Sequence, residues 1–339
     1  MNLVKKLLLA LCAMPLMLLG WIGIAYAEKE ATIGYQLVYN PWKVSIADGS
    51  IEEATGYKID FRKFDSGSKV INAMASGDVD IALAGSSPIA AGVSRGVDMQ
   101  LVWIFEDIAA AEALVVRNGS GINGPQDLKG KKLGVPFVST THFHTLFALE
   151  QFGIDPNDVE ILNMQPNQIS AAWERGDIDA AFVWDPALGR IKETGNVLIT
   201  SGQLCKWGKC TFDGMVASRE FAEANPEFMA KFIRKVAEAD AAYRDNVAAW
   251  TGDSEQAKAI ANLVGGNPED VPGVLALYGF PTMEEQASPA WLGGGADGGA
   301  AKALMFTSEF LKAEGKIPEL QPDYGKFVNS SYVEAAMGQ

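Results

Sequence analysis

The sequence predicts an α/β protein of two lobes with a ligand cleft between them. Short apolar, strand-like runs alternate with helical stretches, a pattern typical of parallel sheets with helices on both faces. A unit of helix, glycine turn and strand also occurs twice, at residues 66–84 and 169–184, with Gly77 and Gly176 beginning the two turns. Two copies in a chain of 339 residues predict two α/β domains rather than one.

The first lobe is expected to open with a strand at 32–36 and a helix at 41–54. A strand at 59–64 then leads into a helix at 66–76, the turn Gly77-Asp78-Val79-Asp80 and a strand at 81–84. Glycine follows the helix at the position where a positive φ costs it least. These elements form the first copy of the repeated unit.

The second lobe is expected to begin with a strand at 133–135 and a helix that runs to about residue 151. The second copy follows as a strand at 159–164, a helix at 169–175, the turn Gly176-Asp177-Ile178-Asp179 and a strand at 180–184. Two further strands, 113–116 and 214–217, lie where the chain passes between the lobes.

The N-terminus has the three parts of a secretory signal peptide. Lys5 and Lys6 precede an apolar run, and Ala25-Tyr26-Ala27 supplies the small residues that a signal peptidase needs. We expect cleavage after Ala27, which predicts a chain secreted to the periplasm. A single membrane anchor is the alternative, because the apolar run approaches the length that spans a bilayer.

Composition excludes several classes of function. The formal charge is −14, which argues against nucleic acid because phosphate binding needs a basic face. Only 2 His are present, and His142 and His144 lie two positions apart at a helix start, so they diverge and cannot share a metal ion. We therefore expect neither a metal site nor a cofactor. Cys205 and Cys210 form an even pair, which favours a disulfide in an oxidising compartment.

Two hydroxyl-rich segments follow predicted strands and open predicted helices. They are Gly85-Ser86-Ser87-Pro88, in which Ser87 is expected to cap the helix, and Ser139-Thr140-Thr141-His142. Free N–H groups and the partial positive charge of a helix N-terminus make such places suitable for an anionic headgroup. Helix capping alone is the alternative interpretation. No basic residue lies in either segment, which favours a monoanion over a polyphosphate.

Acidic and aromatic residues are expected near the same cleft. Trp184 and Asp185 end a repeated strand, Glu112 precedes the strand at 113–116, and Asp213 precedes the strand at 214–217. Each carboxylate taken alone is more often solvated than functional. Together they could hold a cation opposite the helix N-termini, with Trp184 packing on the ligand.

At these residues the sequence resembles the taurine-binding proteins of ATP-binding-cassette (ABC) importers, within the wider sulfonate/nitrate/taurine group of periplasmic binding proteins. The similarity runs in order along nearly all of the chain after residue 27. The matching segments include Arg62-Lys63-Phe64-Asp65-Ser66-Gly67, Ala75-Ser76-Gly77-Asp78-Val79, Gly85-Ser86-Ser87-Pro88, Glu112-Ala113-Leu114-Val115-Val116, Val135-Pro136-Phe137, Ser139-Thr140-Thr141-His142 and Ala171-Ala172-Trp173 through Trp184.

The resemblance implies a type II periplasmic-binding fold with residues 28–115 and 215–339 in domain 1 and residues 116–214 in domain 2. It also implies a monomer that closes around its ligand by a hinge motion and delivers it to a membrane permease, with no chemistry. The residues that it assigns to the sulfonate are Gln36, Ser86, Ser87, Thr140 and Thr141; those assigned to the ammonium are Glu112 and Asp213, with Trp184 packing against the ligand.

Two features depart from the family pattern. Asp185 stands where a small residue is expected and is a possible additional acid at the site, as His142 is a possible additional contact. The Cys205/Cys210 pair is not expected throughout the family. The alternatives are another alkanesulfonate, nitrate or a small zwitterion as ligand, or an enzyme resembling the thiamine-pyrimidine synthases that would use His142 or His144.

Overall fold

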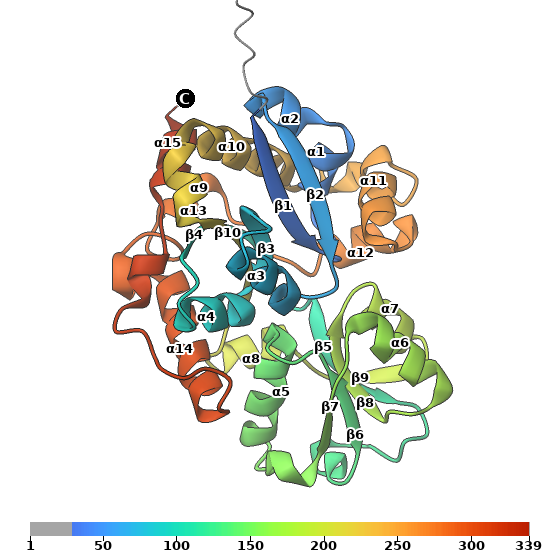
Figure 1. Ribbon diagram of the computed structural model, residues 1–339. Coiled ribbons are helices and arrows are strands. Elements are labelled where there is room, and N and C mark those ends of the chain that lie inside the picture. Colours follow the sequence, from blue (N-terminus) through green and yellow to red (C-terminus); the bar gives the residue numbers. More distant parts are fainter. Residues whose placement is uncertain (1–28, 339) are drawn as a thin grey trace, which may run out of the picture.

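The computed structural model describes residues 29–338 as two lobes, each built on a five-stranded sheet (Figure 1). The expected signal peptide, residues 1–27, lies outside the described residues. Within 29–338, no helix has the length and apolar character needed to cross a membrane.

The first lobe contains a sheet with strand order β2-β1-β3-β10-β4. Strands β1, β2 and β3 are parallel, and β10 runs antiparallel to β3 and β4. The strands are β1 (Glu30–Gln36), β2 (Lys58–Phe64), β3 (Ile81–Gly85), β4 (Met99–Asp107) and β10 (Phe212–Ser218). The helices between them are α1 (Lys43–Ala47), α2 (Ser50–Thr55), α3 (Gly67–Ala75) and α4 (Ser86–Ser94).

The second lobe contains a sheet with strand order β7-β6-β8-β5-β9, in which β5 runs antiparallel to β8 and β9. Its strands are β5 (Glu112–Arg117), β6 (Lys132–Val135), β7 (Glu160–Asn163), β8 (Ala180–Trp184) and β9 (Gly195–Thr200). Its helices are α5 (Thr140–Gln151), α6 (Pro166–Arg175), α7 (Ala187–Lys192) and α8 (Ser201–Lys206).

The C-terminal third of the chain packs mainly on the first lobe (Figure 1). It forms the helices α9 (Arg219–Ala224), α10 (Pro226–Asp245), α11 (Glu255–Val264), α12 (Val271–Leu275), α13 (Met283–Ala287), α14 (Gly299–Ala313) and α15 (Ser331–Met337). Helix α14 packs on α4 and also reaches the second lobe, where the Phe310 ring lies 5.0 Å from that of Phe143 in α5. This helix therefore touches both lobes beside the cleft.

The two-lobed α/β prediction is confirmed, but the expectation of parallel sheets is wrong for the strands at the crossings. Each parallel strand runs toward the neighbouring lobe and ends at the cleft. A strand that enters from the other lobe starts at the cleft, so it runs in the opposite direction. Strands β5 and β10 both enter in this way, and both sheets are mixed.

Sheet membership also moves the domain boundaries from their expected places. The boundaries at 115/116 and 214/215 fall inside β5 and β10. All of β5 pairs within the second sheet and all of β10 within the first, because a strand's backbone groups are satisfied by a single sheet. We therefore place the crossings at residues 108–111 and 207–211.

Two local helix predictions are corrected by the structure. The helix expected at 41–54 is divided into α1 and α2 at Gly49, whose φ of 75° lies in the left-handed region. Ser87 does not cap α4, because the helix begins at Ser86, two residues before Pro88, with Gly85 in the capping position.

The expected disulfide is present. Cys205 and Cys210 are bonded and close a short loop between α8 and β10. A loop of this length stabilises the fold by roughly 2 kcal/mol in the chain-entropy model. It fixes the second crossing segment, which leads directly to Asp213 in β10.

Candidate ligand-binding site

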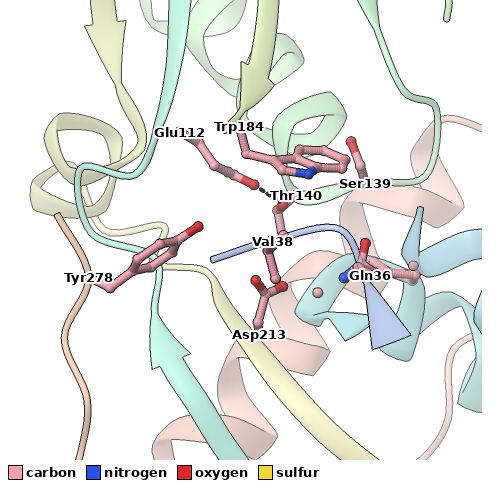
Figure 2. A pocket seen from close by; sticks show the side chains of 11 residues that line it. Gln36, Val38, Glu112, Ser139, Thr140, Trp184, Asp213 and Tyr278 are labelled. Atoms are coloured by element: carbon pink, nitrogen blue, oxygen red, sulfur yellow. Dashed lines mark hydrogen bonds between the residues drawn. The ribbon is translucent and has the colours of Figure 1, made fainter. Parts of the chain in front are cut away.

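A pocket lies between the two lobes, at the carboxyl ends of the parallel strands. In open α/β sheets this edge is where ligands bind. The pocket is lined by Gln36, Val38, Gly67, Gly85, Pro88, Asp213 and Tyr278 from the first lobe and by Glu112, Ser139, Thr140 and Trp184 from the second (Figure 2). A ligand here would contact both lobes at once.

Three helix N-termini meet at the pocket, although the sequence indicated only two. Gly67 begins α3, Gly85 caps α4, and Ser139 caps α5 by accepting a hydrogen bond from the His142 backbone N–H at 3.0 Å. Each N-terminus carries unpaired N–H groups and a partial positive charge. No Lys or Arg is among the lining residues. The pocket can therefore hold an anion with backbone dipoles and hydroxyls in place of a formal positive charge.

The four hydroxyl residues predicted to contact the anion differ in their position relative to the pocket. The side-chain oxygens of Ser86 and Ser87 are fully buried just behind Gly85, and neither has a hydrogen-bond partner within the described residues. Thr140 lines the pocket, and its hydroxyl donates to Glu112 Oε1 at 2.5 Å. Thr141 does not line the pocket; its hydroxyl lies 2.7 Å from that of Ser139.

Glu112 begins β5 and faces the pocket from the second lobe (Figure 2). Thr140 contacts one carboxyl oxygen, and Ser201 Oγ lies 3.0 Å from the other. Burial raises the pKa of Glu112 to about 8, and the nearby Asp213 also raises it. Burial thus disfavours the ionised form of Glu112, and the hydrogen bonds with Thr140 and Ser201 lower its pKa only in part.

Asp213 is the second residue of β10 and faces the pocket from the first lobe, opposite Glu112 (Figure 2). It pairs with Gly85 of β3 on one side and Glu106 of β4 on the other. Burial raises the pKa of Asp213 to about 6. The two carboxyl groups thus come from different lobes and meet across the pocket.

A buried polar network that the sequence analysis missed lies behind Asp213. Lys43 Nζ donates to Asn40 Oδ1 at 2.6 Å, and Asn40 Nδ2 donates to Glu106 Oε1 at 3.2 Å. Lys43 and Glu106 are both 0% exposed, and burial lowers the pKa of Lys43 to about 7 while raising that of Glu106. No local signal identifies Lys43, because the sequence around it resembles an ordinary helix start.

Tyr278 is a second lining residue that the sequence analysis missed. Its hydroxyl points into the space between Glu112 and Asp213 (Figure 2). The segment is held in place by Gly279, whose N–H donates to the Asp107 carbonyl at 2.9 Å. Burial and the surrounding carboxyl groups raise the pKa of Tyr278, so the phenol keeps its proton. It supplies a neutral polar group beside the two acids.

Two residues named as possible contacts lie outside the lining. Asp185 is buried, and its Oδ1 accepts from the Gly189 backbone N–H at 2.9 Å near the start of α7. The His142 ring stacks on Phe137 with ring centroids 4.5 Å apart, and burial lowers its pKa to about 4. The His142 ring also lies 6.4 Å from that of Phe310 in α14. Neither side chain lines the pocket. Among residues 29–338, no group of three or more potential metal ligands occurs.

Comparisons with known proteins agree with this architecture. The periplasmic aliphatic sulphonate binding protein SsuA from Escherichia coli superposes with a TM-score of 0.71 at 22% identity, over 89% of this chain and 98% of that one. The periplasmic nitrate-binding protein NrtA from Synechocystis PCC 6803 superposes with a TM-score of 0.69 at 14% identity, over 92% and 89%. The fold is that of these periplasmic binding proteins.

Sequence similarity identifies the family to which the chain belongs. A taurine-binding periplasmic protein of Escherichia coli (strain K12) is 38% identical over 316 residues, which are 93% of this chain and 96% of that protein. The NMT1/THI5-like family model matches residues 53–246, and the chain belongs to that family. It is a solute-binding protein and not an enzyme, and the resemblance noted from its sequence is confirmed.

Proposed function

We propose that the protein captures taurine, 2-aminoethanesulfonate, in the interlobe pocket and delivers it to an ABC permease. The observation that carries this proposal is the pairing of three helix N-termini with two buried carboxyl groups in one pocket. A zwitterion with an anionic and a cationic end needs both kinds of partner. The similarity to the taurine-binding protein of Escherichia coli supports the same ligand.

In this proposal the sulfonate lies among the helix N-termini of α3, α4 and α5. Ser86 and Ser87 have buried hydroxyls without partners, which would cost free energy unless a ligand accepts from them. Gln36 and Thr140 line the same region. We assign these four residues to the sulfonate, Thr140 through its backbone N–H in the first turn of α5, since its hydroxyl donates to Glu112. Thr141 is left as a support for Ser139, because their hydroxyls already contact each other.

The ammonium lies between Glu112 and Asp213 in this proposal, and Trp184 covers the ethylene group. Trp184 is 5% exposed and lines the pocket from the end of β8. Closure of the two lobes by a hinge motion at residues 108–111 and 207–211 would bring Glu112 and Asp213 to the amine together, since they belong to different lobes.

A simple alkanesulfonate or nitrate is a weaker candidate. Neither carries a positive group, and two buried carboxyl groups in the same small pocket would then repel the anion once ionised. We also propose that the chain is cleaved after Ala27, is secreted to the periplasm and acts there as a monomer. The periplasmic assignment is supported by the relatives, which are periplasmic binding proteins.

Calorimetric titration of the purified protein, starting at Glu28 and stripped of carried-over ligand, tests the ligand directly. We expect taurine to bind one to one and to raise the melting temperature by mass action. Ethanesulfonate, which lacks the amine, should bind more weakly. Absence of both heat and thermal stabilisation with taurine would refute the proposed ligand and leave the fold unaffected.

The affinity for taurine is expected to rise with pH between about 6 and 8. The ligand's ammonium needs an ionised Glu112, whose pKa is raised to about 8, so a proton must leave on binding. Because one proton is released, the taurine affinity should rise roughly tenfold for each pH unit below that pKa. Ethanesulfonate should show the opposite trend or none. A taurine affinity that is constant over this range would contradict the assigned role of Glu112.

A further inference from the structure

A chain of buried polar groups extends from Glu112 away from the pocket. Ser201 Oγ lies 3.0 Å from Glu112 Oε2, and His144 Nδ1 lies 2.7 Å from Ser201 Oγ. On the far side of the ring, His144 Nε2 lies 2.8 Å from the carbonyl oxygen of Lys209. Ser201 is 1% exposed and His144 is 0% exposed. Neither residue lines the pocket.

The positions of the protons along this chain follow from which groups can donate. A carbonyl oxygen only accepts, so His144 Nε2 must carry the hydrogen that points to Lys209. Burial lowers the pKa of His144 to about 4, so the ring is neutral and has one N–H. Its Nδ1 is therefore an acceptor and takes the single hydroxyl proton of Ser201.

This assignment leaves Ser201 Oγ as an acceptor toward Glu112. An ionised Glu112 would accept the Ser201 hydroxyl proton at Oε2 and leave His144 Nδ1 without a donor, whereas a protonated Glu112 donates from Oε2 to Ser201 Oγ and satisfies both contacts. The other carboxyl oxygen, Oε1, accepts from the Thr140 hydroxyl, as the carbonyl oxygen of a neutral acid does. The protonated form of Glu112 is thus the one that gives every contact of this chain a hydrogen.

The other groups that face Glu112 favour the same state. Asp213 approaches from β10 and raises the pKa of Glu112, and Tyr278 presents a neutral phenol. No Lys or Arg lines the pocket. The Lys209 ammonium lies over the Phe306 ring, 4.4 Å from its centroid. Nothing that lines the pocket offers a positive charge to an ionised Glu112 until a ligand supplies one.

We propose that the Lys209 carbonyl, His144 and Ser201 hold Glu112 as an uncharged acid in the empty pocket, and that capture of an aminosulfonate expels this proton. The proposal rests on the proposed function. The Oε2–H bond of Glu112 breaks, the proton passes to a buffer base in solution, and the ligand's ammonium takes its place beside the carboxylate. Ser201 then turns its hydroxyl to the carboxylate. His144 is a positioning residue, because it acts on the ligand only through Ser201 and Glu112.

This arrangement would make the amine the trigger for ionisation. A simple sulfonate brings no positive charge, so it leaves Glu112 protonated and expels no proton. The protonated acid avoids repulsion between a carboxylate and the incoming sulfonate while the pocket fills. A sulfonate ligand therefore needs an amine to reach full affinity for the pocket.

The test is calorimetry at pH 7 in two buffers with different ionisation enthalpies, which gives the number of protons released. For taurine we expect about 0.9 proton per ligand, the protonated fraction for a pKa of about 8, and for ethanesulfonate close to zero. His144→Leu removes the acceptor for Ser201, so the serine hydroxyl can donate to an ionised Glu112. The pH midpoint of taurine affinity should then move down by about one unit, and the released proton count at pH 7 should fall from about 0.9 to about 0.5 per ligand.

Two further variants separate this effect from damage to the fold. In His144→Gln the amide can donate to Lys209 and accept from Ser201, so the wild-type proton count should be restored. Thr145→Val removes a neighbouring buried hydroxyl of α5, which donates to the Thr141 carbonyl, and should leave the count unchanged. Equal counts in wild type and His144→Leu would overturn the proposal.

Infrared difference spectra of the ligand-free protein, wild type minus Glu112→Gln at pH 7, test the proton without any ligand. We expect the carbonyl band of a protonated carboxylic acid. Its absence would overturn the proposal even if taurine binds. If the band is present but taurine fails to bind in every buffer, the proposed function is wrong while the protonated state of Glu112 stands.

Discussion

Asp213→Asn is expected to weaken taurine binding by roughly 30-fold or more, because removing one partner of a buried charge pair costs about 2 kcal/mol or more. Asp213 is 6% exposed and faces the pocket from the first lobe, so water would not replace the lost charge. Glu112→Gln should have a loss of similar size and should also remove the rise in taurine affinity between pH 6 and 8. Calorimetric dissociation constants at pH 8 give both values.

The same two variants should change ethanesulfonate binding by less than about threefold, since that ligand has no ammonium. Asp107→Asn is the matched control: Asp107 ends β4 close by, but its carboxylate accepts from the Ala109 N–H and does not line the pocket. Its taurine affinity should stay at the wild-type value. Equal losses for taurine and ethanesulfonate in Asp213→Asn would refute the assignment of the acids to the amine.

Gly85→Ala is expected to weaken taurine binding strongly while leaving the fold intact. A Cβ at Gly85 would lie 2.9 Å from Thr140 Cγ2 and 3.2 Å from Asp213 Oδ1, so it would enter the pocket where the two lobes meet. The backbone at Gly85 has φ −63° and ψ 157°, which alanine adopts without strain. Overpacking of this kind costs about 1–3 kcal/mol, or roughly 5- to 150-fold in affinity.

The measurement is the taurine dissociation constant together with the melting temperature of the ligand-free protein. Gly273→Ala is the control, because a Cβ at this exposed position in α12 meets nothing within 4 Å. The melting temperature of Gly85→Ala should stay close to wild type, since lobes that open relieve the closer contact, with Thr140, and the longer one with Asp213 involves only a side-chain oxygen. An unchanged dissociation constant would mean that the lobes lie farther apart in the bound form than they do here.

Much of the pocket was predictable because strand ends are visible in a sequence. Gln36, Trp184 and Asp213 lie at the ends of apolar runs, and the edge of a parallel sheet brings such ends together. Glu112 was found in the same way, and Thr140 by its place at a helix start. The alternation of strands and helices likewise predicted the α/β class and the two lobes.

Other residues in and behind the pocket have no local signal in the sequence. Tyr278 enters the pocket from a segment more than 60 residues beyond Asp213, where Gly279 pairs with Asp107 of β4. Lys43 and Glu106 meet through Asn40 although β2 and β3 separate them in the chain. The sequence shows neither contact, because each depends on packing between distant segments.

The sequence by itself determined the fold class, the disulfide pair and the residue types at the strand ends, since periodicity and turn residues are local properties. Only the tertiary structure decided the directions of β5 and β10 and the places of Asp185 and His142 away from the pocket. It also decided the charge state of Glu112. A carboxyl group's pKa depends on the water removed from it and on the donors and acceptors around it, and here Ser201 and His144 come from helices that fold against β5 from elsewhere in the chain.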